Sequence, residues 1–342
     1  MKKLLLPIIL ITLLTACNQE PVTLRLMTHD SFEISESVIN QFETETGVTV
    51  EIFKSGDAGK MVNEAILAKD APLADVLFGL DNTFLSRALE NDIFIPYESP
   101  ELANIPDALK LDSSNQALPV DFGDVCLNYD KAWFAENGIE PPQSLEQLAE
   151  PAYASLTVVE NPATSSPGLA FLLATIGHFG EEGYVAFWEK MANNGVAIAS
   201  GWEEAYYGQF TAASDGDRPI VVSYASSPPA EVFFAEQELT EAPTAAITAD
   251  GTCFRQIEFV GILQGTEHEE AARQLVDFML SRPFQEDIPL NMFVYPANET
   301  AVLPDVFTQF STIPDAPAQV GPEAISENRA NWIETWTRSV LR

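Results

Sequence analysis

The chain has 342 residues, and 17 Lys and Arg stand against 51 Asp and Glu, which gives a formal net charge of −34. Affinity for nucleic acid comes largely from basic side chains that neutralise phosphates, so this charge excludes nucleic-acid binding as the main activity. Hydrophobic residues make up 46% of the chain, too large a share for a disordered acidic protein. The length predicts about two folded domains.

The N-terminus predicts export and a lipid anchor. Two lysines precede an apolar stretch at 4–14, and small residues follow it directly before Cys17. This pattern is typical of a secretory signal peptide, and the stretch is shorter than the ~20 residues of a membrane-spanning helix. Leu14-Thr15-Ala16-Cys17 also resembles the bacterial lipobox, whose cysteine is acylated and becomes the new N-terminus. An ordinary signal peptide with an incidental cysteine is the alternative.

We therefore expect a signal peptide at 1–16, lipid attachment at Cys17 and a short tether at 17–21. Cleavage removes two lysines and no acid, so the mature net charge becomes 15 − 51 = −36. The mature protein is predicted to be periplasmic or at the cell surface, anchored to a membrane without crossing it. Two cysteines remain, Cys126 and Cys253. Outside the cytoplasm two such thiols can pair, so a disulfide is expected, with two buried free thiols as the alternative.

Strands and helices alternate in the first part of the chain. Alternating apolar residues at 22–26 predict a strand that ends in the polar turn 28–31. Helical spacing follows from Ile34 to Phe42, and Gly47 ends that helix. Further strands are expected at 48–53 and 74–80, and further helices at 60–68 and 84–89. This alternation predicts parallel strands whose ligands bind beyond their carboxyl ends, so the loops at 29–31, 55–59 and 81–82 are the first candidates for a site.

A second alternating region begins near Val125. Ser144 and Gln147 form a capping box, and the segment 161–168 carries hydroxyls and prolines before a helix that starts near Leu169. Such a helix start presents free backbone N–H groups that suit an anion, although most Ser-Pro helix starts bind no ligand. Strands are expected at 125–129, 156–159, 196–199, 220–224 and 254–263, a helix at 269–280, a loop at 291–296 and a last helix whose Ile325, Arg329, Trp332, Trp336 and Val340 form a docking stripe.

Two α/β regions joined by more than one extended segment predict an α/β fold with two lobes around a cleft. The segments that join the lobes would be crossing strands that act as a hinge. The expected division places 22–124 and 254–342 in lobe 1 and 125–253 in lobe 2.

Catalytic constellations are absent from the sequence. His29, His178 and His268 are far apart, neither mature cysteine has a metal-ligand neighbour, and no nucleophile elbow, P-loop or dinucleotide fingerprint occurs. The sequence therefore predicts no enzyme activity, no metal and no cofactor. A hydrolase with paired carboxylates is the weaker alternative, because no pair stands out among many acids.

Several stretches together carry a family resemblance: Thr28-His29-Asp30-Ser31-Phe32, Gly79-Leu80-Asp81-Asn82, Asp121-Phe122-Gly123, Pro162 to Gly168, Gly201-Trp202-Glu203-Glu204-Ala205-Tyr206, Ser223 to Pro228, and Trp332-Ile333-Glu334-Thr335-Trp336. In this order they resemble the periplasmic thiamine-binding proteins, the solute receptors of the thiamine ABC importer. The resemblance implies a type II periplasmic-binding fold without catalysis. It also implies a monomer that closes on thiamine, thiamine monophosphate or thiamine pyrophosphate and docks on permease subunits.

The resemblance also implies roles for particular residues. Asp57 and Ala58, with Ser165 and Ser166, match the two places where that family holds the ligand's phosphate. Trp202 and Tyr224 match ring contacts, and Ser227 lies in the adjoining loop. His29 stands at a family Tyr position and Phe293 at a family Trp position, while the family's Trp after the first strand has no counterpart here.

Thiamine carries a permanent cation, and a cation over an aromatic face gains roughly 0.5–2 kcal/mol. Trp202, Tyr224 and Phe293 could supply such faces, although each could equally be a core aromatic. Asp30, Asp81 and Asp121 follow or end predicted strands and could offset the charge. Receptors for another small cation or for ferric iron are alternatives, since iron-binding relatives use neighbouring tyrosines and Tyr206 and Tyr207 are adjacent.

Overall fold

The computed structural model describes residues 22–341. The predicted signal peptide, the lipid-attachment residue Cys17 and the tether lie outside the described residues. Within the described part, one sheet of 11 strands runs through the whole molecule in the order β2-β1-β3-β10-β5-β8-β6-β7, with β4 on β10 and with β9 and β11 on β5. The strands are β1 (Thr23–Thr28), β2 (Thr49–Lys54), β3 (Val76–Asp81), β4 (Phe94–Ile95), β5 (Leu118–Asp130), β6 (Thr157–Glu160), β7 (Ala197–Ala199), β8 (Ile220–Tyr224), β9 (Thr244–Ile247), β10 (Phe254–Leu263) and β11 (Tyr295–Pro296).

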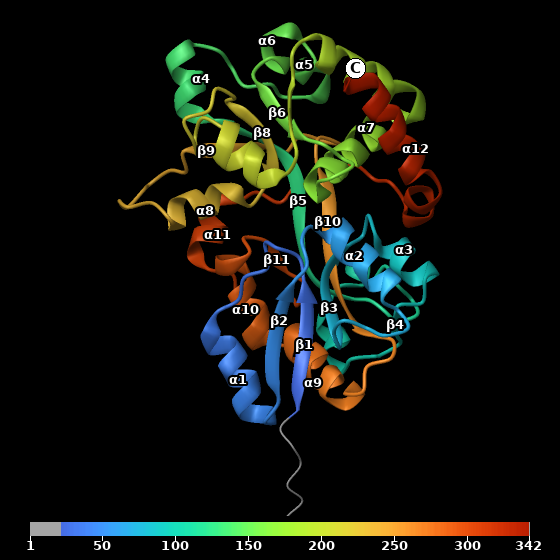
Figure 1. The fold of residues 1–342 in the computed structure, drawn as a ribbon. Coiled ribbons are helices and arrows are strands. Elements are labelled where there is room, and N and C mark those ends of the chain that lie inside the picture. Colours follow the sequence, from blue (N-terminus) through green and yellow to red (C-terminus); the bar gives the residue numbers. More distant parts are fainter. Residues whose placement is uncertain (1–21, 342) are drawn as a thin grey trace, which may run out of the picture.

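Figure 1 shows two lobes stacked along the long strands β5 and β10. Lobe 1 contains β1 to β4 and β11, and lobe 2 contains β6 to β9. As the alternation predicts, β1 pairs in parallel with β2 and β3, and β6 pairs in parallel with β7 and β8. The central strands β5 and β10 are antiparallel to each other. β5 pairs with β11 in lobe 1 and with β8 and β9 in lobe 2, while β10 runs beside β5 and pairs with β3 and β4 in lobe 1. These two long strands form the strand hinge.

The strand β5 is much longer than the predicted strand 125–129. Its first residues pair with β11 in lobe 1, through Phe122 and Tyr295, and its last residues pair with β8 in lobe 2, through Val125 and Tyr224. Because Leu118 to Val120 are buried on both faces of the sheet, this part of the strand lacks the alternation from which strands are recognised. The chain therefore crosses between lobes near residue 124.

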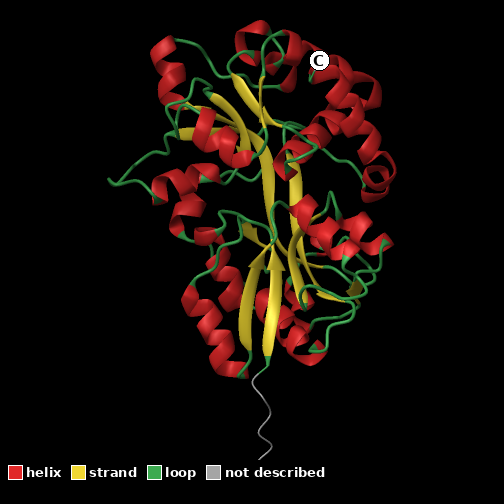
Figure 2. Cartoon of the chain, in the orientation of Figure 1, coloured by secondary structure: helices red, strands yellow, loops and turns green. Residues whose placement is uncertain are grey.

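Helices cover the sheet in both lobes (Figure 2). They are α1 (Glu36–Thr46), α2 (Ala58–Leu67), α3 (Leu85–Glu90), α4 (Lys131–Asn137), α5 (Leu145–Leu148), α6 (Pro151–Ala154), α7 (Ser166–Asn193), α8 (Ser227–Phe233), α9 (Glu269–Leu280), α10 (Arg282–Asn291), α11 (Asp305–Phe310) and α12 (Pro322–Val340), with a π-helical segment η3 (Glu204–Gln209). Within residues 22–341, no helix combines the length and the apolar composition that crossing a membrane requires.

The ends of these helices follow the local signals in the sequence. α1 ends at Gly47, whose φ of 72° is left-handed and whose N–H donates to the carbonyl of Glu43. The Ser144 side chain accepts a hydrogen bond from the N–H of Gln147 at the start of α5, as the capping box predicts. Ser165 caps α7 in the same way, through the N–H of Gly168 at 3.2 Å.

The C-terminal helix α12 bridges the two lobes. Its Trp336 is buried and packs edge-on against Trp188 of α7, with ring centroids 5.5 Å apart. On its other side α12 contacts α3 of lobe 1, where the hydroxyl of Ser326 donates to Glu90. The predicted docking stripe is thus a buried contact. Because α12 packs on α7, which belongs to the range assigned to lobe 2, the assignment of the whole of 254–342 to lobe 1 stays a proposal.

Candidate functional site

Three acidic side chains form a row across the hinge. Glu258 of β10 lies directly opposite Asp81 of β3 on one side and Asp121 of β5 on the other. Residues directly opposite in a sheet project their side chains to the same face, and like charges in such positions repel each other. Asp81 and Asp121 are 0% exposed. The row therefore concentrates negative charge, shielded from water, where the two lobes meet.

The environment of this row favours protonation or a cation. Burial, and then the neighbouring Glu258, raise the pKa of Asp121 well above its usual range. Burial also raises the pKa of Asp81. Neither carboxylate oxygen of Asp121 has a hydrogen-bond donor among the described residues. A bound cation would lower the electrostatic cost of this cluster.

His29 is the base that faces the row. Its Nε2 lies 3.4 Å from Oε1 of Glu258. Burial alone would lower the pKa of His29, but Glu258 and the acids behind it raise that pKa above its ordinary value. The ring fits only because residue 79 is Gly, with φ of 92°: a Cβ there would lie 2.1 Å from the imidazole. Arg329 of α12 also interacts with Asp81, but Asp57 adds a fourth acid, so the acids near the row outnumber these two bases.

Two helix N-termini meet beside the row, one from each lobe. Asp57 caps α2, which begins at Ala58, and the backbone N–H of Ser166 at the start of α7 faces the Asp57 carboxylate and lowers its pKa. Burial is the larger effect, however, and raises the pKa of Asp57 overall. The hydroxyl of Ser166 donates to Asp81, and this bond joins lobe 2 to the acid row. The residues that the resemblance places near phosphate thus lie together.

A chain of hydrogen bonds extends from the acid row into lobe 2. Gln256 donates to Asp81 at 2.7 Å and accepts from the hydroxyl of Tyr224 at 2.8 Å. Gly123 makes room for Tyr224, since a Cβ at that position would lie 2.8 Å from its ring. Burial, and then the surrounding acids, raise the pKa of Tyr224 well above its usual range, so its hydroxyl stays a donor.

The second predicted ring contact, Trp202, joins the same region through serines. Its indole N–H donates to Ser223 at 2.9 Å, and the Ser223 hydroxyl lies 2.8 Å from that of Ser227. Ser227 in turn accepts from the N–H of Tyr224 at 3.3 Å. The sequence therefore identifies, far apart along the chain, residues that the structure brings into one network.

The two adjacent tyrosines have different environments. Tyr206 is 4% exposed, stacks on Trp202 with ring centroids 4.9 Å apart, and donates its hydroxyl to Glu231. Tyr207 is 61% exposed, and its ring lies at 76° to that of Tyr206.

Within residues 22–341, no group of three or more His, Cys, Asp or Glu side chains is arranged to hold a metal ion.

Phe293 lies apart from this network. Its φ of 55° is left-handed, and its carbonyl accepts from the Ser226 hydroxyl at 2.6 Å. The ring packs with Phe233 and Phe234 of lobe 2, at centroid distances of 6.0 and 5.2 Å, and stacks on Phe307. Phe293 therefore joins an aromatic contact between the lobes.

Cys126 and Cys253, the two cysteines that follow Cys17, form a disulfide that links the hinge strands. Cys126 of β5 and Cys253, next to the start of β10, have Cα atoms 4.4 Å apart. Val125 pairs with Phe254 in the same ladder, so the bridge lies between antiparallel neighbours. It closes the whole segment between them, which contains lobe 2.

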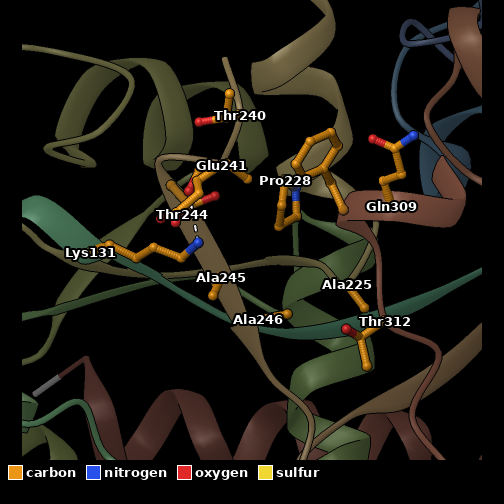
Figure 3. A pocket seen from close by; sticks show the side chains of 12 residues that line it. Lys131, Ala225, Pro228, Thr240, Glu241, Thr244, Ala245, Ala246, Gln309 and Thr312 are labelled. Carbon is orange, nitrogen blue, oxygen red and sulfur yellow. Dashed lines mark hydrogen bonds between the residues drawn. The ribbon is translucent and has the colours of Figure 1, made fainter. Parts of the chain in front are cut away.

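The structure also describes a pocket of about 390 Å³ away from this network. Figure 3 shows it between the segment around β9 and the end of α11, with Lys131, Thr240, Gln309 and Thr312 around it. Lys131 donates to the carbonyl of Ala242 at 2.8 Å. None of the predicted ligand contacts lines this pocket, so it does not compete with the acid row as the candidate site.

Sequence reasoning missed four polar residues of the site, Glu160, Ser223, Gln256 and Glu258. Gln256 and Glu258 occupy alternate positions in the polar first half of a strand that is apolar from Phe259 onward, which was the available signal. Their importance depends on β10 lying between β3 and β5, two strands separated by 36 residues of sequence.

Residues 71–316 match the sequence model of the family described as bacterial extracellular solute-binding protein. The thiamine-binding periplasmic protein of Escherichia coli is 30% identical to this chain, over 100% of both proteins. That of Brucella suis is 29% identical, over 96% of this chain and 95% of the relative. A solved periplasmic thiamin-binding protein superposes with a TM-score of 0.82 at 28% identity, covering 94% of this chain and 96% of the other.

These relatives are solute-binding proteins of transport systems, so the hydrolase alternative is not supported. The predicted two-lobed, type II periplasmic-binding fold is confirmed by the same likeness. The chain belongs to the bacterial extracellular solute-binding protein family.

Proposed function

We propose that this protein is an exported, lipid-anchored receptor that binds thiamine or a thiamine phosphate between its lobes and delivers it to an ABC permease. The observation that carries the proposal is the row of Asp81, Glu258 and Asp121, against which the described residues set His29 beside Glu258 and the Arg329 guanidinium near Asp81. Buried acids with so little compensation suit a ligand that brings a permanent positive charge. The full-length similarity to thiamine-binding periplasmic proteins supports thiamine as that cation.

The ligand's rings and phosphate have separate candidate partners. Trp202 and Tyr224 supply aromatic faces, with Ser227 beside them. For a phosphate, the candidates are the helix starts at Asp57 with Ala58 and at Ser165 with Ser166. His29 would compensate the acids when no ligand is bound, and Phe293 would contact the ligand at the edge of the site.

Ferric iron fits this site less well than an organic cation. The hydroxyl of Tyr206 already donates to Glu231, while Tyr207 points to solvent. Two adjacent phenolates cannot therefore approach one metal ion without breaking the bond to Glu231. The proposed receptor acts as a monomer, with a hinge at β5 and β10 between a first lobe of 22–124 and 254–342, bridged by α12, and a second lobe of 125–253.

Titration calorimetry of the mature protein with thiamine, thiamine monophosphate and thiamine pyrophosphate tests the ligand. We expect binding of at least one of them, with affinity that falls when Asp121 is replaced by Asn. No heat and no thermal shift with any of the three would reject thiamine as the ligand.

The anchor is tested separately, by the mass and membrane association of the protein expressed in bacteria. We expect a mature chain that begins with an acylated Cys17 and sediments with membranes. Cys17→Ala should release a soluble or unprocessed protein whose affinity for thiamine is unchanged. A mature wild-type protein without lipid would reject the anchor and leave the binding function intact.

A further inference from the structure

Glu160 is a buried acid whose carboxylate is not used within the described structure. It is the last residue of β6 and is 1% exposed, yet neither Oε1 nor Oε2 has a hydrogen-bond partner among the described residues. Burial raises its pKa well above its usual range and outweighs the opposite effect of its own backbone N–H. Leaving a polar group buried without a partner costs roughly 1–3 kcal/mol, so such a group needs an explanation.

The sheet register shows which way this side chain faces. Val158 of β6 pairs with Val221 of β8, and because the strands are parallel, Glu160 lies level with Ser223 on the same face. The Ser223 hydroxyl accepts from the indole N–H of Trp202. Val158 and Val221 pack in one cluster with Ala199 and Tyr206, against which Trp202 also packs. Glu160 is therefore the last residue of β6 on the sheet face against which Trp202 packs.

Glu160 also belongs to the electrostatic surroundings of the site. Together with Asp57, Asp81 and Glu258 it raises the pKa of Tyr224. It differs from those acids in position, since it lies in lobe 2, beneath the start of α7. A Cβ on Gly168 of α7 would lie 2.7 Å from the carbonyl oxygen of Glu160, so the helix start closes over this residue. Its effect on Tyr224 places the Glu160 carboxylate close to the rings of the candidate site.

We propose that Glu160 is a specificity-determining residue that recognises the amino group and adjacent ring nitrogen of an aminopyrimidine lying against Trp202. This inference rests on the proposed function, because thiamine is the ligand that supplies this ring. A protonated carboxyl group and an aminopyrimidine edge match in geometry: the carbonyl oxygen accepts from the exocyclic amine, and the O–H donates to the neighbouring ring nitrogen. The row of Asp81, Glu258 and Asp121 then faces the thiazolium cation, so each half of the ligand has its own acid partner.

The test compares thiamine with oxythiamine, in which an oxygen replaces the exocyclic amine and the cation is retained. Wild-type protein should bind thiamine about 10- to 100-fold more tightly, because oxythiamine presents an acceptor to Glu160. Glu160→Met removes both oxygens with little change of volume. It should lower thiamine affinity by about the same factor and leave oxythiamine affinity within about threefold, so that the preference disappears.

Folding and general charge effects are separated by two further variants. Glu160→Gln keeps the shape and a carbonyl acceptor, so it should retain part of the preference for thiamine. Glu231→Gln is the matched control, since this buried acid of the same lobe already accepts from Tyr206 and Thr244. We expect it to keep the wild-type preference between the two ligands.

Two results would overturn this inference while leaving the proposed function in place. The first is that wild-type protein binds thiamine and oxythiamine with equal affinity. The second is that both Glu160 variants lose the same amount of affinity for thiamine as for oxythiamine. Wild-type protein that binds neither ligand would reject the proposed function and this inference together. Thermal unfolding of the empty variants checks the fold, and Glu160→Met should melt no lower than wild type because a buried unpaired acid is removed.

Discussion

The two lobes present different chemistry to each other. Lobe 1 and the hinge strands contribute charge, and lobe 2 contributes rings and hydroxyls. The charged set consists of His29, Asp57, Asp81, Asp121 and Glu258. The second set consists of Ser165, Ser166, Trp202, Ser223, Tyr224 and Ser227, with Glu160 as its buried acid. The site is complete only where these two sets meet.

This difference separates two kinds of selectivity. Charge acts over several ångströms in a low-dielectric interface and favours any cation of suitable size. Stacking on a ring requires contact and a defined geometry, and so depends on the shape of the ligand. We therefore expect substitutions on the lobe 1 side to change affinity for cations in general and substitutions on the lobe 2 side to change selectivity among them.

The largest expected effect is on stability and concerns the disulfide that joins the hinge strands. Replacing Cys126 and Cys253 together by Ala should lower the free energy of unfolding by about 3–5 kcal/mol, because the bridge closes a long segment and restricts the unfolded chain. Chemical denaturation measures this loss. Thiamine affinity should stay within about threefold, since neither cysteine lies among the acids or rings. Equal stability of the variant and the wild type would show that the bridge does not restrict the unfolded chain.

The next effect tests the charged set. Asp121→Asn removes an unpartnered acid opposite Glu258 and should weaken thiamine binding by about 1.5–3 kcal/mol, measured by calorimetry. The empty variant should unfold at a higher temperature, because a buried like-charge contact is lost. Asp124→Asn is the matched control: this acid of the same strand is also buried, but Arg255 donates to both its oxygens at 3.0 and 2.9 Å. It should lose stability and keep its affinity.

The raised pKa of Asp121 also predicts that the stability of the empty protein depends on pH. The pKa of Asp121 is higher in the folded protein than in the unfolded chain, where an Asp titrates near about 4, so the folded state binds the proton more tightly. The empty wild type should therefore lose stability as the pH rises from about 4 towards the folded pKa, and Asp121→Asn should flatten this slope. Thiamine affinity should rise with pH over the same window, because the cation favours the ionised form. A slope that is identical in the variant would remove Asp121 as its source.

A smaller effect tests the rings of lobe 2. Trp202→Ala should weaken thiamine binding by at least about 1 kcal/mol, and Trp202→Phe should restore part of the loss because it keeps an aromatic face. Trp133→Ala, on α4, removes a ring that packs on Phe134 and should leave the affinity unchanged. Unchanged affinity in a folded Trp202→Ala variant would reject the ring as a wall of the site.

A feature of this site can be predicted from the sequence when residues close together in the chain determine it. The end of α1 at Gly47 and the caps at Ser144 and Ser165 are set by a few neighbouring residues, so they were predictable. The carboxyl ends of strands point to loops that hold His29 and Asp57. The resemblance added Trp202 and Tyr224, which no local pattern distinguishes from core aromatics.

The acids that complete the site are determined at long range. Glu258 matters because β10 inserts between β3 and β5, and that strand order is not encoded in any short segment. Glu160 ends a short, fully buried strand. Nothing in the sequence around it shows that its carboxylate has no hydrogen-bond partner among the described residues. Periodicity identifies faces of elements, but it does not identify which faces meet.

Phe293 provides the smallest effect and the sharpest test of the comparison between lobes. It is the aromatic residue of lobe 1 that the resemblance places in the site, yet its ring packs with Phe233 and Phe234 across the lobe boundary. If it acts by holding the lobes together, Phe293→Ala should weaken binding by only about 0.5–1 kcal/mol, and by the same amount for thiamine and its phosphates. Phe234→Ala should then have a similar effect, although that ring is 69% exposed. A loss in Phe293→Ala larger than that in Trp202→Ala, or one confined to a single ligand, would instead make Phe293 a wall of the site, and lobe 1 would then contribute shape as well as charge.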